Sequence, residues 1–147
     1  TIKESSGLIF LLDSTKREQH DYFSLFIKNF NKLKNTFHTG RGFQEVPIPV
    51  AICVTKMDKD DNFVNNPEKF DIDDYTRKLI GETAFRMLIT NLKFYKFFGV
   101  SGVGWNKKDG KRNYFLNEQG IMSPVGEPQP VHVIEPVEWL LKNSLTK

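Results

Sequence analysis

The residues whose side chains are best suited to bind a ligand form the run Thr55-Lys56-Met57-Asp58, which follows the apolar segment 50–54. The Asp58 carboxylate could accept two hydrogen bonds from a purine edge with a ring N–H and an exocyclic amine, and guanine has this edge. Adenine lacks this pair of donors and would leave the carboxylate unpaired, a mismatch that discriminates strongly. Lys56 could lay its aliphatic stem along the base while its ammonium stays in water. Lys-x-Asp is also a common tripeptide of exposed loops, so from this motif alone we favour an ordinary loop over a base-binding site.

A second polar segment, Ser101-Gly102-Val103-Gly104, follows the aromatic-rich run 93–100. Small residues let backbone N–H groups approach a ligand closely. Ser101 and Gly102 are therefore candidates for contact with the carbonyl oxygen of guanine. The alternative is an ordinary tight loop. The two polar segments occur in this order and each follows an apolar run. Together they therefore indicate guanine binding more specifically than either segment alone.

A third polar segment extends from Asp13 to Arg17, after the apolar run 7–13. It resembles the metal-dependent adhesion site of von Willebrand A-type domains, whose pattern is Asp-x-Ser-x-Ser. Asp13 and Thr15 fit this pattern, but Arg17 replaces the last hydroxyl ligand and would place a positive charge beside a Mg²⁺ ion. Side-chain oxygens at such positions also cap helix N-termini. We favour capping and keep the metal-dependent binding domain as an alternative.

Apolar runs and helical patterns alternate along the chain. The strands are expected at 7–13, 50–54 and 93–100, and the helices at about 16–37, 73–91 and 135–143. This order predicts an α/β fold, a three-layer sandwich with a mainly parallel sheet. The continuous apolar run 7–13 predicts a strand that is buried on both faces. Ligands of such sheets bind at the carboxyl ends of the strands, where all three polar segments lie.

The remaining segments carry weaker signals. The first helix has an apolar stripe with spacings of three and four residues, made of Phe23, Phe26, Ile27, Phe30, Leu33 and Phe37. Gly81 should soften the second helix, and 59–67 should be a polar loop. Residues 106–130 form an expected hairpin-like insertion, with a turn at Asp109-Gly110. We interpret the basic run 107–112 as a solvated hairpin tip and not as a contact patch.

Composition limits the classes of protein. The 147 residues are 39% hydrophobic and 27% charged, with a net charge of +3 and a single cysteine, and we expect one domain, 1–147. No stretch approaches the roughly 18 consecutive apolar residues of a membrane-spanning helix. Because the net charge is small and acidic and basic residues are interspersed along the chain, we expect no nucleic-acid partner. One cysteine allows no internal disulfide and is compatible with a cytoplasmic location. We expect Cys53 to be buried and inert. Because the chain begins with Thr1, we expect a larger protein around it.

These motifs resemble the C-terminal half of a Ras-like P-loop GTPase domain. The run 55–58 is similar to the guanine-specificity motif of that family, Asn/Thr-Lys-x-Asp, and 98–104 looks like its second base-binding loop. The segments 97–101 and 130–141 make the chain most similar to the tandem GTPase-like proteins of prokaryotes. The resemblance implies that GTP or GDP is the ligand. It also implies the residues that bind the base, which are Thr55, Lys56, Asp58, Ser101 and Gly102.

The chain also departs from the family pattern. Thr55 replaces the commoner Asn and lacks the amide that ties this loop to the phosphate loop, and Gly102 replaces the usual Ala. The phosphate loop Gly-x-x-x-x-Gly-Lys-Ser/Thr occurs nowhere in the 147 residues, and neither does the switch motif Asp-x-x-Gly at its family position. In the family both lie N-terminal to the strand at 7–13. The resemblance therefore implies Mg²⁺ binding and GTP hydrolysis only for a longer protein that supplies these parts.

Two function hypotheses follow. The first is recognition of a guanine nucleotide within a larger GTPase or GTPase-like regulatory protein. The second is a pseudo-GTPase scaffold without hydrolysis, which binds other proteins through surfaces such as 106–130. In both cases the strand at 7–13 would have one open edge. Because open edges invite association, we expect the missing N-terminal half or another chain to cover it.

Overall fold

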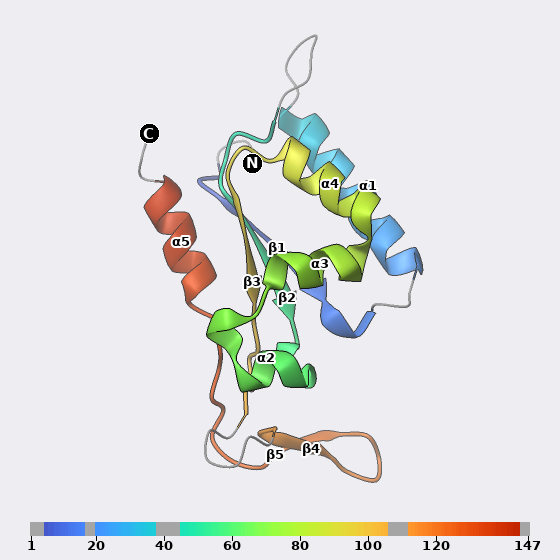
Figure 1. Ribbon diagram of the computed structural model, residues 1–147, viewed down its shortest axis with the longest axis vertical. Coiled ribbons are helices and arrows are strands. Elements are labelled where there is room, and N and C mark those ends of the chain that lie inside the picture. Colours follow the sequence, from blue (N-terminus) through green and yellow to red (C-terminus); the bar gives the residue numbers. More distant parts are fainter. Residues whose placement is uncertain (1–4, 17–19, 38–44, 106–111, 145–147) are drawn as a thin grey trace.

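Three parallel strands form the central sheet, β1 (Leu8–Asp13), β2 (Val50–Thr55) and β3 (Tyr95–Gly99), in this spatial order. The computed structural model describes residues 5–16, 20–37, 45–105 and 112–144 (Figure 1). Asp13 pairs with Thr55 in the register of β1 and β2, and Val54 pairs with Gly99 in that of β2 and β3. The predicted α/β class and the three expected strands are confirmed. The register brings the carboxyl ends of the strands together.

Helices cover both faces of this sheet (Figure 1). On one face lie α1 (His20–Phe37), α3 (Ile72–Ile80) and α4 (Glu82–Asn91), and on the other lies α5 (Glu135–Ser144). Alternate residues of β2 divide between two cores, as the period of a strand requires. Ile52 and Val54 belong to the core beneath α1, α3 and α4. Cys53 belongs to the core beneath α5, and its burial raises the pKa of the thiol to about 11.

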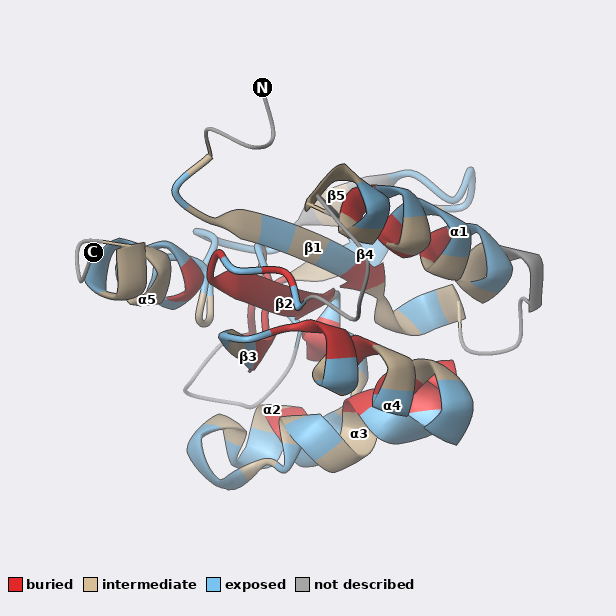
Figure 2. Ribbon diagram, turned by 90° about the horizontal axis from the view of Figure 1, so that it is seen from above, coloured by how far each residue is buried: buried red, intermediate tan, exposed pale blue. Residues whose placement is uncertain are grey.

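The prediction that the strand at 7–13 is buried on both faces is wrong. Leu12 is fully buried beneath the helices, but Ile9 and Leu11 on the opposite face are 45% and 63% exposed. The reason is that the second core, beneath α5, gathers around side chains of β2 and β3 and leaves this face of β1 uncovered (Figure 2). Among the described residues, β1 pairs only with β2. The expectation that another segment covers its open edge stays a prediction.

The two long helical regions form largely as expected. In α1 the apolar stripe faces the sheet, with Phe26, Phe30 and Leu33 buried. The structure describes this helix from His20 to Phe37, and residues 14–16, where its start is expected, form a 3-10 turn. Residues 17–19 of the expected helix lie outside the described residues. The region 73–91 is two helices, since Gly81 has φ 84° and separates α3 from α4.

The expected polar loop at 59–67 contains a short helix instead. In α2 (Asp61–Asn65) the Asp60 side chain caps the first turn by accepting from the amides of Asn62 and Phe63. Phe63 is 1% exposed and packs edge-on against Phe70. Phe63 and the partly buried Val64 therefore fix this short helix against the core.

The insertion at 106–130 contains a hairpin of two antiparallel strands, β4 (Tyr114–Leu116) and β5 (Met122–Pro124), below the carboxyl ends of the sheet (Figure 1). The turn of this hairpin is closed by the Asn117 side chain, which accepts from the amides of Gln119 and Ile121. The turn expected at Asp109-Gly110 and most of the basic run 107–112 lie outside the described residues.

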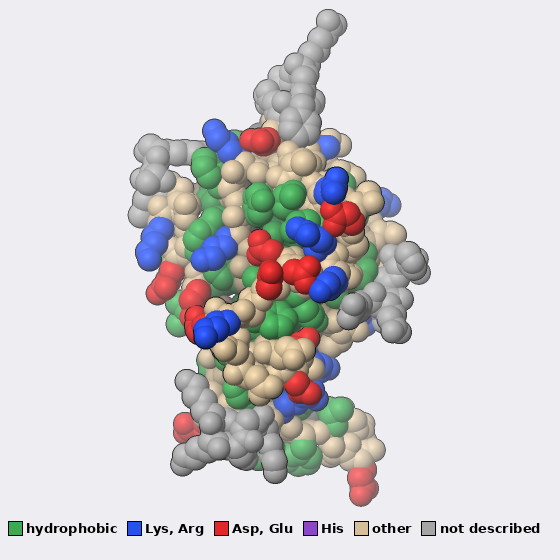
Figure 3. Space-filling model, in the orientation of Figure 1, with side chains coloured by type: hydrophobic (Ala, Val, Ile, Leu, Met, Phe, Trp, Pro, Cys, Tyr) green, Lys and Arg blue, Asp and Glu red, His purple; other side chains and the backbone are tan. Residues whose placement is uncertain are grey.

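Charged side chains of both signs lie side by side on the surface over α3 and α4 (Figure 3). The ion pairs Lys78–Asp74 and Arg86–Glu82 connect successive turns of these helices. In the part of the chain that the structure describes, no helix is long and apolar enough to cross a membrane.

Candidate functional site

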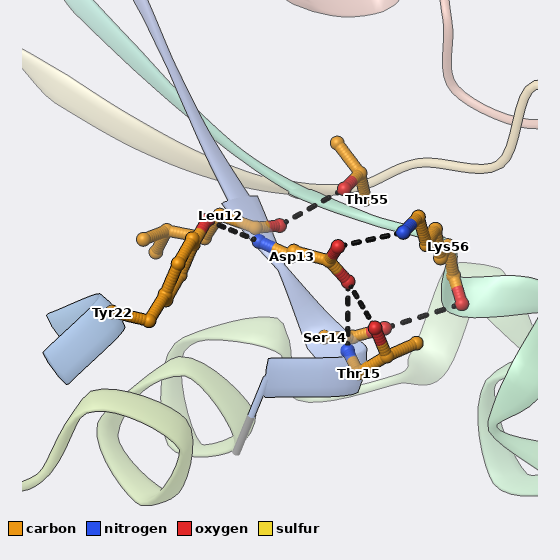
Figure 4. Close-up of polar contacts among 7 residues, drawn as sticks. All are labelled: Leu12, Asp13, Ser14, Thr15, Tyr22, Thr55 and Lys56. Atoms are coloured by element: carbon orange, nitrogen blue, oxygen red, sulfur yellow. Dashed lines mark hydrogen bonds and ion pairs between the residues drawn. The ribbon is translucent and has the colours of Figure 1, made fainter. Parts of the chain in front are cut away.

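Lys56 follows β2 directly, and its backbone is in the left-handed region with φ 61°. This conformation turns the chain sharply and places the Lys56 ammonium 2.6 Å from Asp13 Oδ2 at the end of β1 (Figure 4). The Ser14 hydroxyl donates to the Lys56 carbonyl oxygen over 3.2 Å. The first and second strands are thus tied together at their carboxyl ends, and the aliphatic stem of Lys56 has a fixed direction.

The second carboxylate oxygen of Asp13 caps the following turn. Asp13 Oδ1 accepts from the Thr15 amide at 2.9 Å and from the Thr15 hydroxyl at 2.6 Å (Figure 4). This is the capping role predicted for Asp13, although the capped element is a 3-10 turn. Both carboxylate oxygens therefore have partners within the protein. No group of three His, Cys, Asp or Glu side chains that could hold a metal ion occurs among the described residues.

The pKa of Asp13 reflects these contacts. Burial acts to raise it, but the hydrogen bonds from Lys56 and Thr15 and the charge of Lys56 outweigh burial and lower the pKa to about 2. The same hydrogen bond raises the pKa of Lys56. Because the folded protein keeps Asp13 ionised below its ordinary pKa of 3.8, the pair stabilises the fold above that pH. This contribution is lost as the pH falls from about 4 towards 2.

The substitution Lys56→Met should therefore weaken the pH dependence of stability. It keeps the length of the aliphatic stem but removes the charge that lowers the pKa of Asp13. In urea unfolding experiments between pH 4 and pH 2, we expect the free energy of unfolding to fall less steeply with acid than in the wild type. Because Lys56 is about half exposed, the difference should be at most about 1 kcal/mol. Equal slopes for both proteins would contradict this role of the pair.

Asp58 follows β2 and Ser101 follows β3, and a hydrogen bond between their side chains joins the ends of these two strands. Asp58 is only 3% exposed, and its Oδ1 accepts from the Ser101 hydroxyl at 2.7 Å. The Ser101 oxygen in turn accepts from the Gly104 amide at 2.9 Å. The Met57 amide also donates to the Val100 carbonyl oxygen. The two polar segments singled out in the sequence are therefore one hydrogen-bonded unit.

A cavity of about 480 Å³ opens beside this unit. Its volume lies in the range of about 300–1,000 Å³ that is typical of small-molecule sites. The predicted base-binding residues that line it are Thr55, Lys56, Asp58 and Gly102. Ser101 is 1% exposed and lies behind them, where its hydroxyl positions Asp58. The Thr55 hydroxyl donates to the Leu12 carbonyl oxygen, which ties β2 to β1 (Figure 4).

The insertion makes contacts with the site that the sequence did not indicate, and one of them comes from Arg112, the last residue of the basic run 107–112 that is predicted to be a solvated tip. Arg112 donates from Nε to the Asp58 carbonyl oxygen at 3.1 Å and from a second guanidinium nitrogen to that of Lys59 at 3.2 Å. Tyr114 and Leu116 of β4 line the same cavity. A strand of three residues in a Gly- and Pro-rich segment has too short an apolar alternation to be recognised.

Comparisons of the chain with protein-family models, with curated proteins and with solved structures found no match.

Proposed function

We propose that the cavity at the carboxyl ends of β1 and β2 binds a guanine nucleotide and that Asp58 recognises its base. The observation that carries this proposal is the Asp58 carboxylate, which is 3% exposed yet lines the cavity together with Lys56 and Gly102. A buried acceptor of this kind is stabilised by donors, and guanine supplies two on one edge. Asp58 keeps the capacity to accept them, because a carboxylate has about four acceptor sites, of which the Ser101 hydroxyl uses one and the Tyr114 hydroxyl a second.

The neighbours of Asp58 suit the remaining surfaces of a purine. The ion pair with Asp13 holds the Lys56 stem at the cavity wall, where its methylene groups would pack on the face of the base. A Cβ added at Gly102 would meet no atom within 4 Å. The backbone there is open to close approach by the carbonyl oxygen of guanine.

We propose base recognition as one part of a larger GTPase-like regulatory protein. The 147 residues contain no Gly-x-x-x-x-Gly-Lys-Ser/Thr sequence to hold the phosphates and Mg²⁺. The residues of this chain would bind and orient the base, and hydrolysis would depend on groups supplied by other parts of the protein.

The test is the substitution Asp58→Ala in the natural full-length protein, with GDP binding measured by calorimetry. Two hydrogen bonds to a charged acceptor contribute about 1.5–3 kcal/mol each, so the affinity should fall at least about 100-fold. Asp61→Ala is the matched control, because this carboxylate lies close in sequence but is exposed on α2. Unchanged GDP affinity in Asp58→Ala would contradict the proposal. Absence of nucleotide binding in the wild type would favour the pseudo-GTPase alternative.

A further inference from the structure

Strand β4 presents alternate side chains to the candidate site. Tyr114 and Leu116 line the cavity that Lys56 and Asp58 also line, whereas Phe115 between them does not. This alternation is the ordinary period of a strand. One face of the hairpin is therefore turned towards the cavity over the length of β4.

The hairpin is fixed to both polar segments of the site. Arg112, just before β4, donates to the carbonyl oxygens of Asp58 and Lys59. The next residue, Asn113, is 6% exposed and donates from Nδ2 to the Val103 carbonyl oxygen at 3.3 Å. These bonds place the start of β4 against both loops. The side chains of β4 thus have a defined position at the cavity.

The environment of Tyr114 is coupled to that of Asp58. Burial raises the pKa of the Tyr114 hydroxyl, and the negative charge of Asp58 and a hydrogen bond with it raise it further. The phenol therefore remains a neutral donor at physiological pH. Its ring is half-buried and supplies an aromatic surface next to the carboxylate.

We propose that β4 is a third wall of the nucleotide site, in which Tyr114 and Leu116 contact the bound purine together with Lys56 and Asp58. This inference rests on the proposed function and adds two ligand-binding residues to it. An aromatic ring gains affinity for a base by stacking, because every base has an apolar face. Because Tyr114 would contact the base and not the phosphates, removal of its ring should lower the affinities for GDP and GTP by the same factor.

The test compares Tyr114→Ala with Phe115→Ala in the natural full-length protein. Removal of one base–aromatic contact should lower the affinities for both GDP and GTP about tenfold, and Phe115→Ala should leave them within about twofold of the wild-type values. Calorimetric titration measures these affinities. A change below about twofold in Tyr114→Ala, or the same loss in Phe115→Ala, would overturn the inference. A loss of binding in Asp58→Ala in the same series would show that base recognition itself still holds.

A second measurement avoids the effect of a variant on folding. The wild-type protein is labelled with ¹³C in its tyrosine rings, and the Tyr114 signal is assigned as the one missing in Tyr114→Phe. Saturation with GDP should shift this signal, since the base would lie against the ring. No shift in a protein that calorimetry shows to be saturated would overturn the inference. A wild type that binds no GDP would overturn the proposed function and this inference with it.

Discussion

The substitution Asp58→Asn should reverse the preference of the protein from guanine to xanthine nucleotides. Xanthine carries a carbonyl oxygen where guanine has its exocyclic amine. The side-chain amide of the variant would donate to this oxygen and accept from the ring N–H, while the carboxylate of the wild type would face the oxygen without a donor. We expect the wild type to bind GDP at least about 100-fold more tightly than xanthosine diphosphate, and the variant to bind the latter more tightly.

This exchange separates recognition from folding. Asn has almost the same shape as Asp and can still accept from the Ser101 hydroxyl, so the bonded unit of the two loops is retained. Competition of both diphosphates for the protein, measured by calorimetry, gives the ratio of affinities directly. If the variant lost affinity for both nucleotides equally, or kept the wild-type preference, Asp58 would not be the group that recognises the base.

The substitution Gly104→Ala should lower the free energy of unfolding by about 3 kcal/mol or more. Gly104 has φ +60°, a conformation that side chains rarely adopt. An added Cβ would also lie 1.7 Å from the Gln129 carbonyl oxygen, so the backbone would have to move. Strain and overpacking of this kind each cost about 1–3 kcal/mol.

Urea unfolding of Gly104→Ala and Gly102→Ala measures this cost with a matched control two residues away. A Cβ at Gly102 meets nothing within 4 Å, so that variant should change the free energy of unfolding by no more than about 0.5 kcal/mol. Because the Gly104 amide donates to Ser101, which positions Asp58, the first variant should also weaken GDP binding. Equal stability of the two variants would be incompatible with the close approach of 104 and 129.

The sequence was informative where one pattern decided the structure. The run 50–54 is apolar throughout, and all of its residues are buried because helices cover both faces of β2. The order strand–helix–strand implied parallel neighbours, and their register brought Asp58 and Ser101 within a hydrogen bond of each other. The predicted strand order was therefore sufficient to place the segments 55–58 and 101–104 at the same edge of the sheet.

The sequence was not informative where contacts between distant segments decided the structure. The exposure of Leu11 follows from the position of α5, and no pattern within the run 7–13 encodes it. The pairing of Asp13 with Lys56 depends on the left-handed backbone of a lysine, which side-chain chemistry does not predict. The position of Tyr114 depends on the hydrogen bonds that Arg112 donates to two backbone carbonyl oxygens. Because every residue has a carbonyl oxygen, the sequence does not indicate which ones Arg112 will contact.

The measurement that tests base recognition most directly is calorimetric titration of the natural full-length wild type with GDP and with ADP. Both ligands have the same sugar and phosphates, so a difference in affinity comes from the base alone. We predict that GDP binds at least about 100-fold more tightly, because adenine leaves the buried Asp58 carboxylate without its two donors. Equal affinities for GDP and ADP, or tighter binding of ADP, would contradict the assignment of this cavity to guanine.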